Sequence, residues 1–205
     1  MKNNQTETAK PGAATPHLSD SGKQFQAFGT VVEMPNGLSK KLCTQSVSSL
    51  NAILADTITL RDLYKKHHWQ VAGPTFYQLH LLFDKHAEGQ NELVDALAER
   101  IQLLGGVSVA MAGDVSEMTR IERPPSGREP VTMQLSRLLK AHEIVLKAAH
   151  KAASEADDGG DHGTNDLLAS RLIPANEFQS WFVSQHLVEV PGAEETHGSA
   201  KRSAA

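Results

Sequence analysis

Histidines and carboxylates recur at helical spacing between positions 64 and 100, and they carry the chemistry that this sequence can support. Four of the ten histidines of the chain stand in one stretch, YKKHHWQVAGPTFYQLHLLFDKH. Two imidazoles and three carboxylates suit Fe(II), Mn(II) or Zn(II) better than a soft metal. The residues that could supply this donor set, and that interrupt otherwise apolar rows, are His68, His80, Asp84, Asp95 and Glu99.

Four of these residues share one face of a single predicted helix. At ~100° per residue, the positions from His80 to Glu99 fall within about 100° of one another. Asp84 and Asp95 are nevertheless roughly 16 Å apart along the helix axis, whereas a metal–ligand bond is only ~2.0–2.2 Å long. One chain therefore cannot bring all five residues to one metal.

Two copies of the helix, packed antiparallel about a two-fold axis, remove this difficulty. The end that carries His80 and Asp84 in one subunit would meet Asp95 and Glu99 of the other, and symmetry repeats the arrangement. His68, late in the preceding helix, is expected beside His80. A single polar residue on such a face is more often an interface or core group, but five at coherent angles favour two equal metal sites per dimer.

The elements that must position these residues are helices. Apolar residues recur at helical spacing in residues 46–71, 75–104, 131–156 and 165–190, with little strand signal. Gly73-Pro74 separates the first two segments, and Pro174 predicts a kink in the last. A connection of roughly 25 residues, with a short helix near residues 109–118, joins the two pairs. Two helix pairs joined by one long crossover indicate an all-α, ferritin-like four-helix bundle.

The domain organisation follows from composition. Residues 1–40 are predicted to be a flexible arm, 41–190 the bundle and 191–205 a flexible tail, because both ends are rich in small and polar residues. Cys43 is the only cysteine, which excludes an intrachain disulfide. The chain has no apolar leader and no stretch long enough to cross a membrane, so a cytoplasmic location is expected. A net charge of −4 gives no general reason to expect a nucleic-acid partner.

The motifs HHWxVxGPxFxxLHxxFD and DALAERIxxLGG resemble those of the Dps proteins, the mini-ferritins of starved bacterial cells, and the resemblance covers about residues 46–190. It implies a hollow dodecamer whose ferroxidase sites lie at dimer interfaces. Fe(II) would be oxidised there, preferably by hydrogen peroxide, and stored as a ferric mineral. The resemblance assigns the tighter iron to Asp84 and Glu99 and the second iron to His68, His80 and Asp95. Zinc is an alternative occupant or an inhibitor.

A di-iron site inside one bundle, as in ordinary ferritins, is not expected. Such a site needs Glu-x-x-His on two helices. The third predicted helix has Leu146 three residues after Glu143, and the fourth has Ser180 three residues after Glu177.

Several residues near the predicted site can be interpreted in two ways. Trp69 adjoins the site and is interpreted as either a radical quencher or an interface residue. Lys65 matches a lysine near the site of the family, but a solvated helix lysine is the preferred interpretation. His67 is assigned to the surface or to an auxiliary metal contact, and His86 to no role.

The acidic run before the last helix, DDGGDHGTND, suggests a pore that draws in cations where three subunits meet, with Asp161 and Asp166 as its candidates. The alternative is that these residues cap the helix. A DNA-compacting protein with a structural or zinc-filled site is the alternative function, and an oligomer without metal is a third. The first 41 residues carry five lysines against three acidic residues, a net of +2. So few phosphate contacts per subunit favour iron oxidation over DNA binding.

Overall fold

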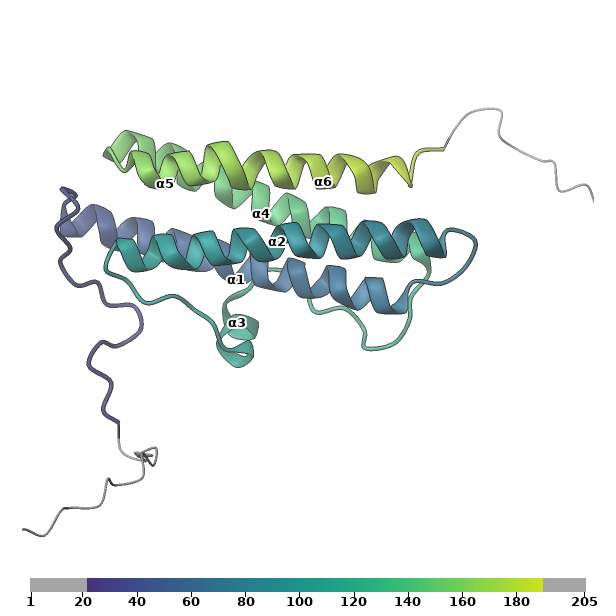
Figure 1. The fold of residues 1–205 in the computed structure, drawn as a ribbon, viewed down its shortest axis with the longest axis horizontal. Coiled ribbons are helices and arrows are strands. Elements are labelled where there is room, and N and C mark those ends of the chain that lie inside the picture. Colours follow the sequence, from purple (N-terminus) through teal and green to yellow (C-terminus); the bar gives the residue numbers. More distant parts are fainter. Residues whose placement is uncertain (1–21, 190–205) are drawn as a thin grey trace, which may run out of the picture.

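The computed structural model describes residues 22–189, which form an all-helical fold without strands in that range. Two long antiparallel helices, α1 and α2, lie side by side, and the second pair packs across them (Figure 1). The elements are α1 (Lys40–Gln70), α2 (Phe76–Leu103), α3 (Ala112–Met118), α4 (Val131–Gly159), α5 (His162–Asp166), the π-helical η1 (Leu167–Leu172) and α6 (Ile173–Gln185). The predicted four-helix architecture with a short helix in the crossover is thereby confirmed.

The helix ends follow local sequence signals. The first helix begins at Lys40, earlier than the predicted residue 46, because Ser39 caps it by accepting a hydrogen bond from the backbone N–H of Leu42. It ends before Gly73, whose φ of 103° suits glycine. The third long helix, α4, ends at Gly160 in the left-handed conformation, with a φ of 83°.

The fourth rod of the bundle is formed by α5, η1 and α6 in succession. The sequence predicts a kink at Pro174, and the structure has a π-helical segment that ends at Leu172, two residues before it. In that segment the backbone N–H of Ile173 donates to the carbonyl of Leu168, five residues earlier. Proline has no N–H to donate, so the α-helical hydrogen-bond pattern is interrupted here, and one widened turn absorbs the interruption.

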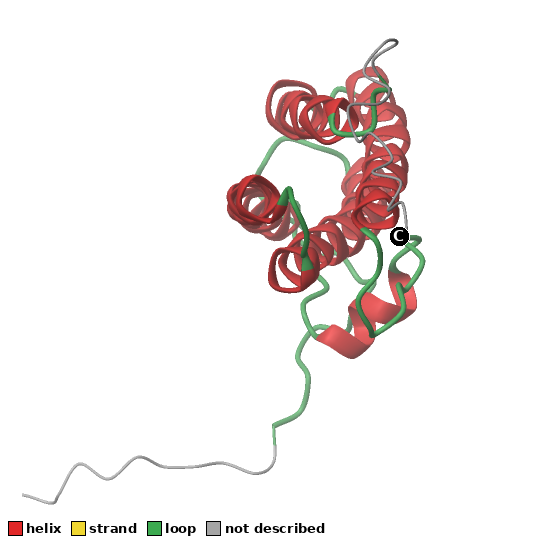
Figure 2. Ribbon diagram, turned by 90° about the vertical axis from the view of Figure 1, so that its right-hand side faces the viewer, coloured by secondary structure: helices red, strands yellow, loops and turns green. Residues whose placement is uncertain are grey.

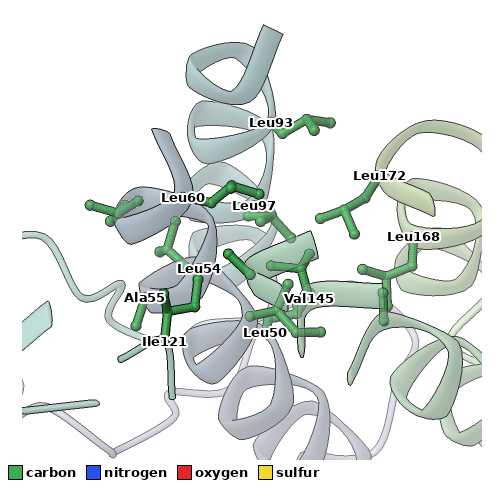
Figure 3. Packing of buried hydrophobic residues seen from close by; sticks show 14 of the residues in the cluster. Leu50, Leu54, Ala55, Leu60, Leu93, Leu97, Ile121, Val145, Leu168 and Leu172 are labelled. Atoms are coloured by element: carbon green, nitrogen blue, oxygen red, sulfur yellow. The ribbon is translucent and has the colours of Figure 1, made fainter. Parts of the chain in front are cut away.

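The core lies between the two helix pairs. Leu50 and Leu54 of α1, Leu97 of α2, Val145 of α4 and Leu168 of η1 are completely buried and converge on one another (Figure 3). Each such side chain contributes about 1.5–3 kcal/mol to the free energy of folding by leaving water. Within residues 22–189, no helix is both long and apolar enough to cross a membrane.

The crossover between α2 and α4 runs outside the bundle, and α3 projects from the side of α1 (Figure 2). Asp56, a buried residue of α1, anchors it. Its carboxylate accepts hydrogen bonds from the backbone N–H, at 2.7 Å, and the guanidinium of Arg120, and from the hydroxyl of Thr119 at 3.0 Å. This ion pair holds the long connection against the helix that carries His68.

Residues 22–39 run along the end of α2. The backbone N–H of Val32 donates to the carbonyl of Gly105 at 2.9 Å, and the Gln26 amide donates to the same oxygen at 2.9 Å. Asn36 donates to the carbonyl of Leu103. The second half of the predicted arm therefore has a defined path, which its sequence lacks the periodicity to reveal. Residues 1–21 and the predicted tail beyond residue 190 lie outside the described residues.

We expect Gly105→Ala to destabilise the protein by about 1–3 kcal/mol. Gly105 has a φ of 80°, and a Cβ there would lie 2.2 Å from the carbonyl oxygen of Val32. Urea unfolding followed by circular dichroism would measure the change. Gly113→Ala is the matched control, because nothing lies within 4 Å of a Cβ at Gly113. Equal stability of the two variants would contradict this account.

Candidate metal centre

His68 and His80 face each other across the junction of α1 and α2. Their rings are stacked, with centroids 3.8 Å apart and planes inclined by 19°. The Nδ1–H of His68 donates to the backbone carbonyl of His80 at 2.8 Å, and the Nδ1–H of His80 donates to the carbonyl of His68 at 2.9 Å. This reciprocal pair fixes both rings and places a proton on each Nδ1, so Nε2 is the nitrogen by which each ring would bind a metal.

Asp84 lies next to the histidine pair, one helical turn after His80. Its Oδ1 is 3.9 Å from the Nε2 of His68 and forms an ion pair with Lys65. The hydrogen bond from Lys65 holds the pKa of Asp84 below its usual value, so the carboxylate stays ionised. Lys65 is therefore not simply solvated. It holds the carboxylate beside the two imidazoles.

Asp95 and Glu99 are exposed further along α2. Across residues 22–189, no three His, Cys, Asp or Glu side chains come close enough to hold one metal ion. The structure stacks His68 on His80 and places Asp84 beside His68 in one subunit, but these three do not form a metal site by themselves, and Asp95 and Glu99 are not brought to them.

Large apolar side chains next to these residues in the sequence are exposed. Trp69 is 70% exposed, Tyr77 68% and Leu81 49%. Tyr77 and Leu81 lie within the ~100° sector of α2 that carries the acidic residues. Apolar groups gathered on a surface indicate contact with another protein, so this face of the subunit has the character of an interface.

The centre of the bundle differs from that of a di-iron protein. Glu143 of α4 is exposed and pairs with Lys147, and Glu177 of α6 is exposed near His150. The centre instead holds Tyr64, for which no role is predicted from the sequence. The polar residues of α4 and α6 that accompany it, His142 and Asn176, interrupt apolar rows and were the available signal.

The surface placement of His67 requires correction, whereas nothing contradicts the absence of a role for His86 at the metal site. Both are buried, with His67 completely inaccessible and His86 only 3% exposed. The prediction that His67 lies at the surface is wrong, because its position faces Phe83 in the interior. Burial lowers the pKa of both rings to about 4, so both are neutral near pH 7. His86 has a partner, since its Nδ1 lies 3.1 Å from the Tyr64 hydroxyl.

Asp161, a candidate for a pore, is fully buried and bound within its own subunit. It forms an ion pair with Arg100 and accepts hydrogen bonds from the hydroxyl of Ser46, at 2.7 Å, and the backbone N–H of Thr164, at 3.1 Å. These bonds outweigh its burial and lower its pKa. These contacts are those of the alternative role, in which Asp161 caps the N-terminus of α5. Asp166 is exposed and remains a candidate.

Comparison with known proteins gives one consistent result. Residues 47–193 match the family model described as a ferritin-like domain. A solved structure, DpsC from Streptomyces coelicolor, superposes with a TM-score of 0.81 at 52% identity, covering 82% of this chain and 98% of that one. An uncharacterised protein of Kitasatospora aureofaciens is 51% identical over 146 residues, 71% of this chain and 97% of the relative. The "DNA protection during starvation protein" of Halobacterium salinarum is 33% identical over 63% of this chain and 71% of its own length.

Proposed function

The chain belongs to the ferritin-like family, among its Dps proteins, and from this premise we propose that it oxidises Fe(II) and stores the ferric product. The observation that carries the proposal is the reciprocal pair of His68 and His80 beside Asp84. Both Nε2 atoms and an ionised carboxylate are available at one place, which is half of a site for a borderline or hard divalent cation.

Asp95 and Glu99 of a second subunit complete the proposed site. The exposed apolar residues near His68 and His80 in the sequence support this pairing, because an isologous dimer would bury them. The pairing gives two sites per dimer, and twelve subunits in a closed cage would provide an interior for the mineral. The cage and its size are part of the proposal, as is an entry route lined by Asp166.

The carboxylates and the imidazoles have different roles in the proposed reaction. Carboxylates stabilise iron as its charge rises from +2 to +3, and the imidazoles hold Fe(II) while leaving positions open to the oxidant. Two Fe(II) ions supply one electron each to one H₂O₂, which takes up two protons and leaves as two water molecules. No hydroxyl radical is released when both electrons arrive together. Lys65 keeps Asp84 ionised before iron binds.

We expect Asp84→Ala and Glu99→Ala to abolish rapid oxidation of Fe(II) by H₂O₂, because each removes a carboxylate that binds the substrate. The absorbance of ferric iron after stopped-flow mixing measures the rate. Zinc, which takes the same donors, should inhibit the wild-type protein. Gel filtration checks that the assembly survives in each variant.

Glu143→Ala is the control for these variants. Glu143 is exposed and pairs only with Lys147, a contact that contributes little to stability. Glu143→Ala would slow iron oxidation only if the iron site lay inside the bundle. If Asp84→Ala and Glu99→Ala keep the wild-type rate, the proposed site is wrong.

DNA binding is the second candidate function, and the names of relatives favour it. One relative from Nostoc, 29% identical over 78% of this chain, is named "Nutrient stress-induced DNA-binding protein". A plasmid gel shift that weakens with salt, and that is lost when residues 1–40 are deleted, would support this function. A shift at low salt only, unchanged by the deletion, would argue against a dedicated DNA-binding arm.

A further inference from the structure

The centre of the bundle holds a chain of hydrogen-bonded polar side chains drawn from all four rods. Tyr64, His142 and Asn176 are completely buried. The Tyr64 hydroxyl lies 2.6 Å from the Nε2 of His142, whose Nδ1 lies 2.9 Å from the Oδ1 of Asn176. His86 approaches the same hydroxyl at 3.1 Å. None of these residues belongs to the proposed iron site.

The positions of the protons follow from the amide of Asn176. Its Nδ2 donates to the carbonyl of Leu172 at 2.8 Å, and its Oδ1 accepts from Gln90 at 3.1 Å. The Oδ1 therefore accepts from His142 as well, so the His142 proton is on Nδ1. The Nε2 of this ring carries a lone pair, and the phenol of Tyr64 donates to it.

Burial keeps both groups in the forms that this geometry requires. It lowers the pKa of His142 to about 3, so the ring is neutral, and it raises the pKa of Tyr64, so the phenol is protonated. A buried phenol that lost an electron but kept its proton would be a cation in an apolar medium, which is very unfavourable. A base within hydrogen-bond distance removes this obstacle, because the proton can move as the electron leaves.

Tyr64 also lies close to the proposed iron ligands. It precedes His68 by one helical turn, about 6 Å along α1. Its ring centroid is 6.0 Å from that of Phe83, the residue before Asp84. The next residue in the chain, Lys65, is bound to Asp84. Three short connections therefore lead from Tyr64 to the site.

We infer that Tyr64 is a one-electron donor to the iron site and that His142 Nε2 accepts its proton. The inference rests on the proposed ferroxidase function and concerns sites that hold one Fe(II) instead of two. One electron then comes from Fe(II) and one from Tyr64. The H₂O₂ takes both electrons and two protons from solvent and leaves as two water molecules. The phenolic proton moves to His142, which leaves Fe(III), a neutral tyrosyl radical and an imidazolium ion.

The chain has only two tyrosines, Tyr64 and Tyr77, which makes the source of a radical simple to assign. Protein loaded with one Fe(II) per proposed site is mixed with H₂O₂ and frozen within milliseconds for electron paramagnetic resonance. A tyrosyl signal is expected in the wild-type protein and in Tyr77→Phe, and it should be lost in Tyr64→Phe. A tyrosyl signal that persists in Tyr64→Phe overturns the inference, as does iron oxidation without any such signal in the wild-type protein.

A second measurement needs no iron. Metal-free protein is illuminated with a ruthenium tris-bipyridine sensitiser and persulfate, and the tyrosyl absorbance is followed. Tyr64→Phe should lose the long-lived radical. His142→Gln, which retains a hydrogen-bond acceptor but no base, should give a lower yield and faster decay. Equal yield and lifetime in His142→Gln and wild-type protein overturn the role of His142.

The two measurements separate the failure of this inference from failure of the proposed function. If the wild-type protein does not oxidise Fe(II), the ferroxidase proposal falls, and the donor role falls with it. The photochemical measurement still decides whether Tyr64 and His142 act as a redox pair. If oxidation is rapid but the photochemical radical is absent in wild-type protein, only the inference is overturned.

Discussion

Assemblies that contain both Asp84→Ala and Glu99→Ala chains should recover activity that neither variant has alone. Each pure variant is expected to lose at least about 100-fold in oxidation rate, because both sites of its dimers lack a carboxylate. In a mixed dimer, the intact Asp84 of one chain meets the intact Glu99 of the other, and one of the two sites is whole. Random mixing by co-expression should therefore restore about a quarter of the sites. Stopped-flow oxidation per subunit measures the recovery.

The reverse mixture is the control. Chains carrying both substitutions are combined with wild-type chains, so that every site of a mixed dimer lacks one carboxylate. Only dimers of two wild-type chains are then active, again about a quarter of the sites, whereas sites within single subunits would leave about half. No recovery in the first mixture, together with half activity in the second, would rule out sites shared between subunits.

The second large effect is a loss of stability in mild acid. Burial lowers the pKa of His67 and His86 to about 4 and that of His142 to about 3, from an ordinary value of 6.5. Between pH 6.5 and pH 4 the unfolded chain binds protons at these positions and the folded chain does not. Stability therefore falls as pH falls through this window, by roughly 2 kcal/mol per histidine at pH 5. Urea unfolding at pH 7.5, 6 and 5 would measure the decline.

His67→Leu separates the contribution of one of these residues. Neither ring nitrogen of His67 has a hydrogen-bond partner within residues 22–189. Leucine therefore removes a buried polar ring without breaking a bond, and it should raise stability by about 1–3 kcal/mol at pH 7. The decline in acid should also become less steep. His150→Gln is the control, since His150 is 60% exposed. Parallel curves for His67→Leu and wild-type protein would refute this explanation.

The architecture was predictable because its signals are local and periodic. Apolar spacing gave four helices, and Gly73-Pro74 gave the turn that brings His68 and His80 together. The N-terminal boundary of α1 was harder to predict. The helix begins six residues before the predicted residue 46, because one serine, Ser39, caps it. The path of residues 22–39 depends on the carbonyl of Gly105, 73 residues beyond Val32, and no local pattern encodes such a contact.

The roles of individual polar residues were harder to predict than the fold. His67 and His68 are neighbours in sequence, but they point to different sides of α1, and only packing decides which of them is buried. Asp161 belongs to an acidic run whose composition suggests the lining of a pore. Its ion pair with Arg100 forms only in the tertiary structure and leaves no local pattern in the sequence. The network around Tyr64 needed all four rods in place before its members could be connected.

The mutual hydrogen bonds of His68 and His80 also bear on how substitutions there are interpreted. Each ring donates to the backbone carbonyl of the other residue, an acceptor that alanine retains, but the two rings also stack on each other. Loss of one imidazole therefore removes a ligand and also the ring against which its neighbour packs. The two residues are thermodynamically coupled, and the effects of replacing them are not additive. A single alanine substitution at either position therefore overstates what that imidazole contributes as a ligand. Only the double-mutant cycle assigns the correct share to each.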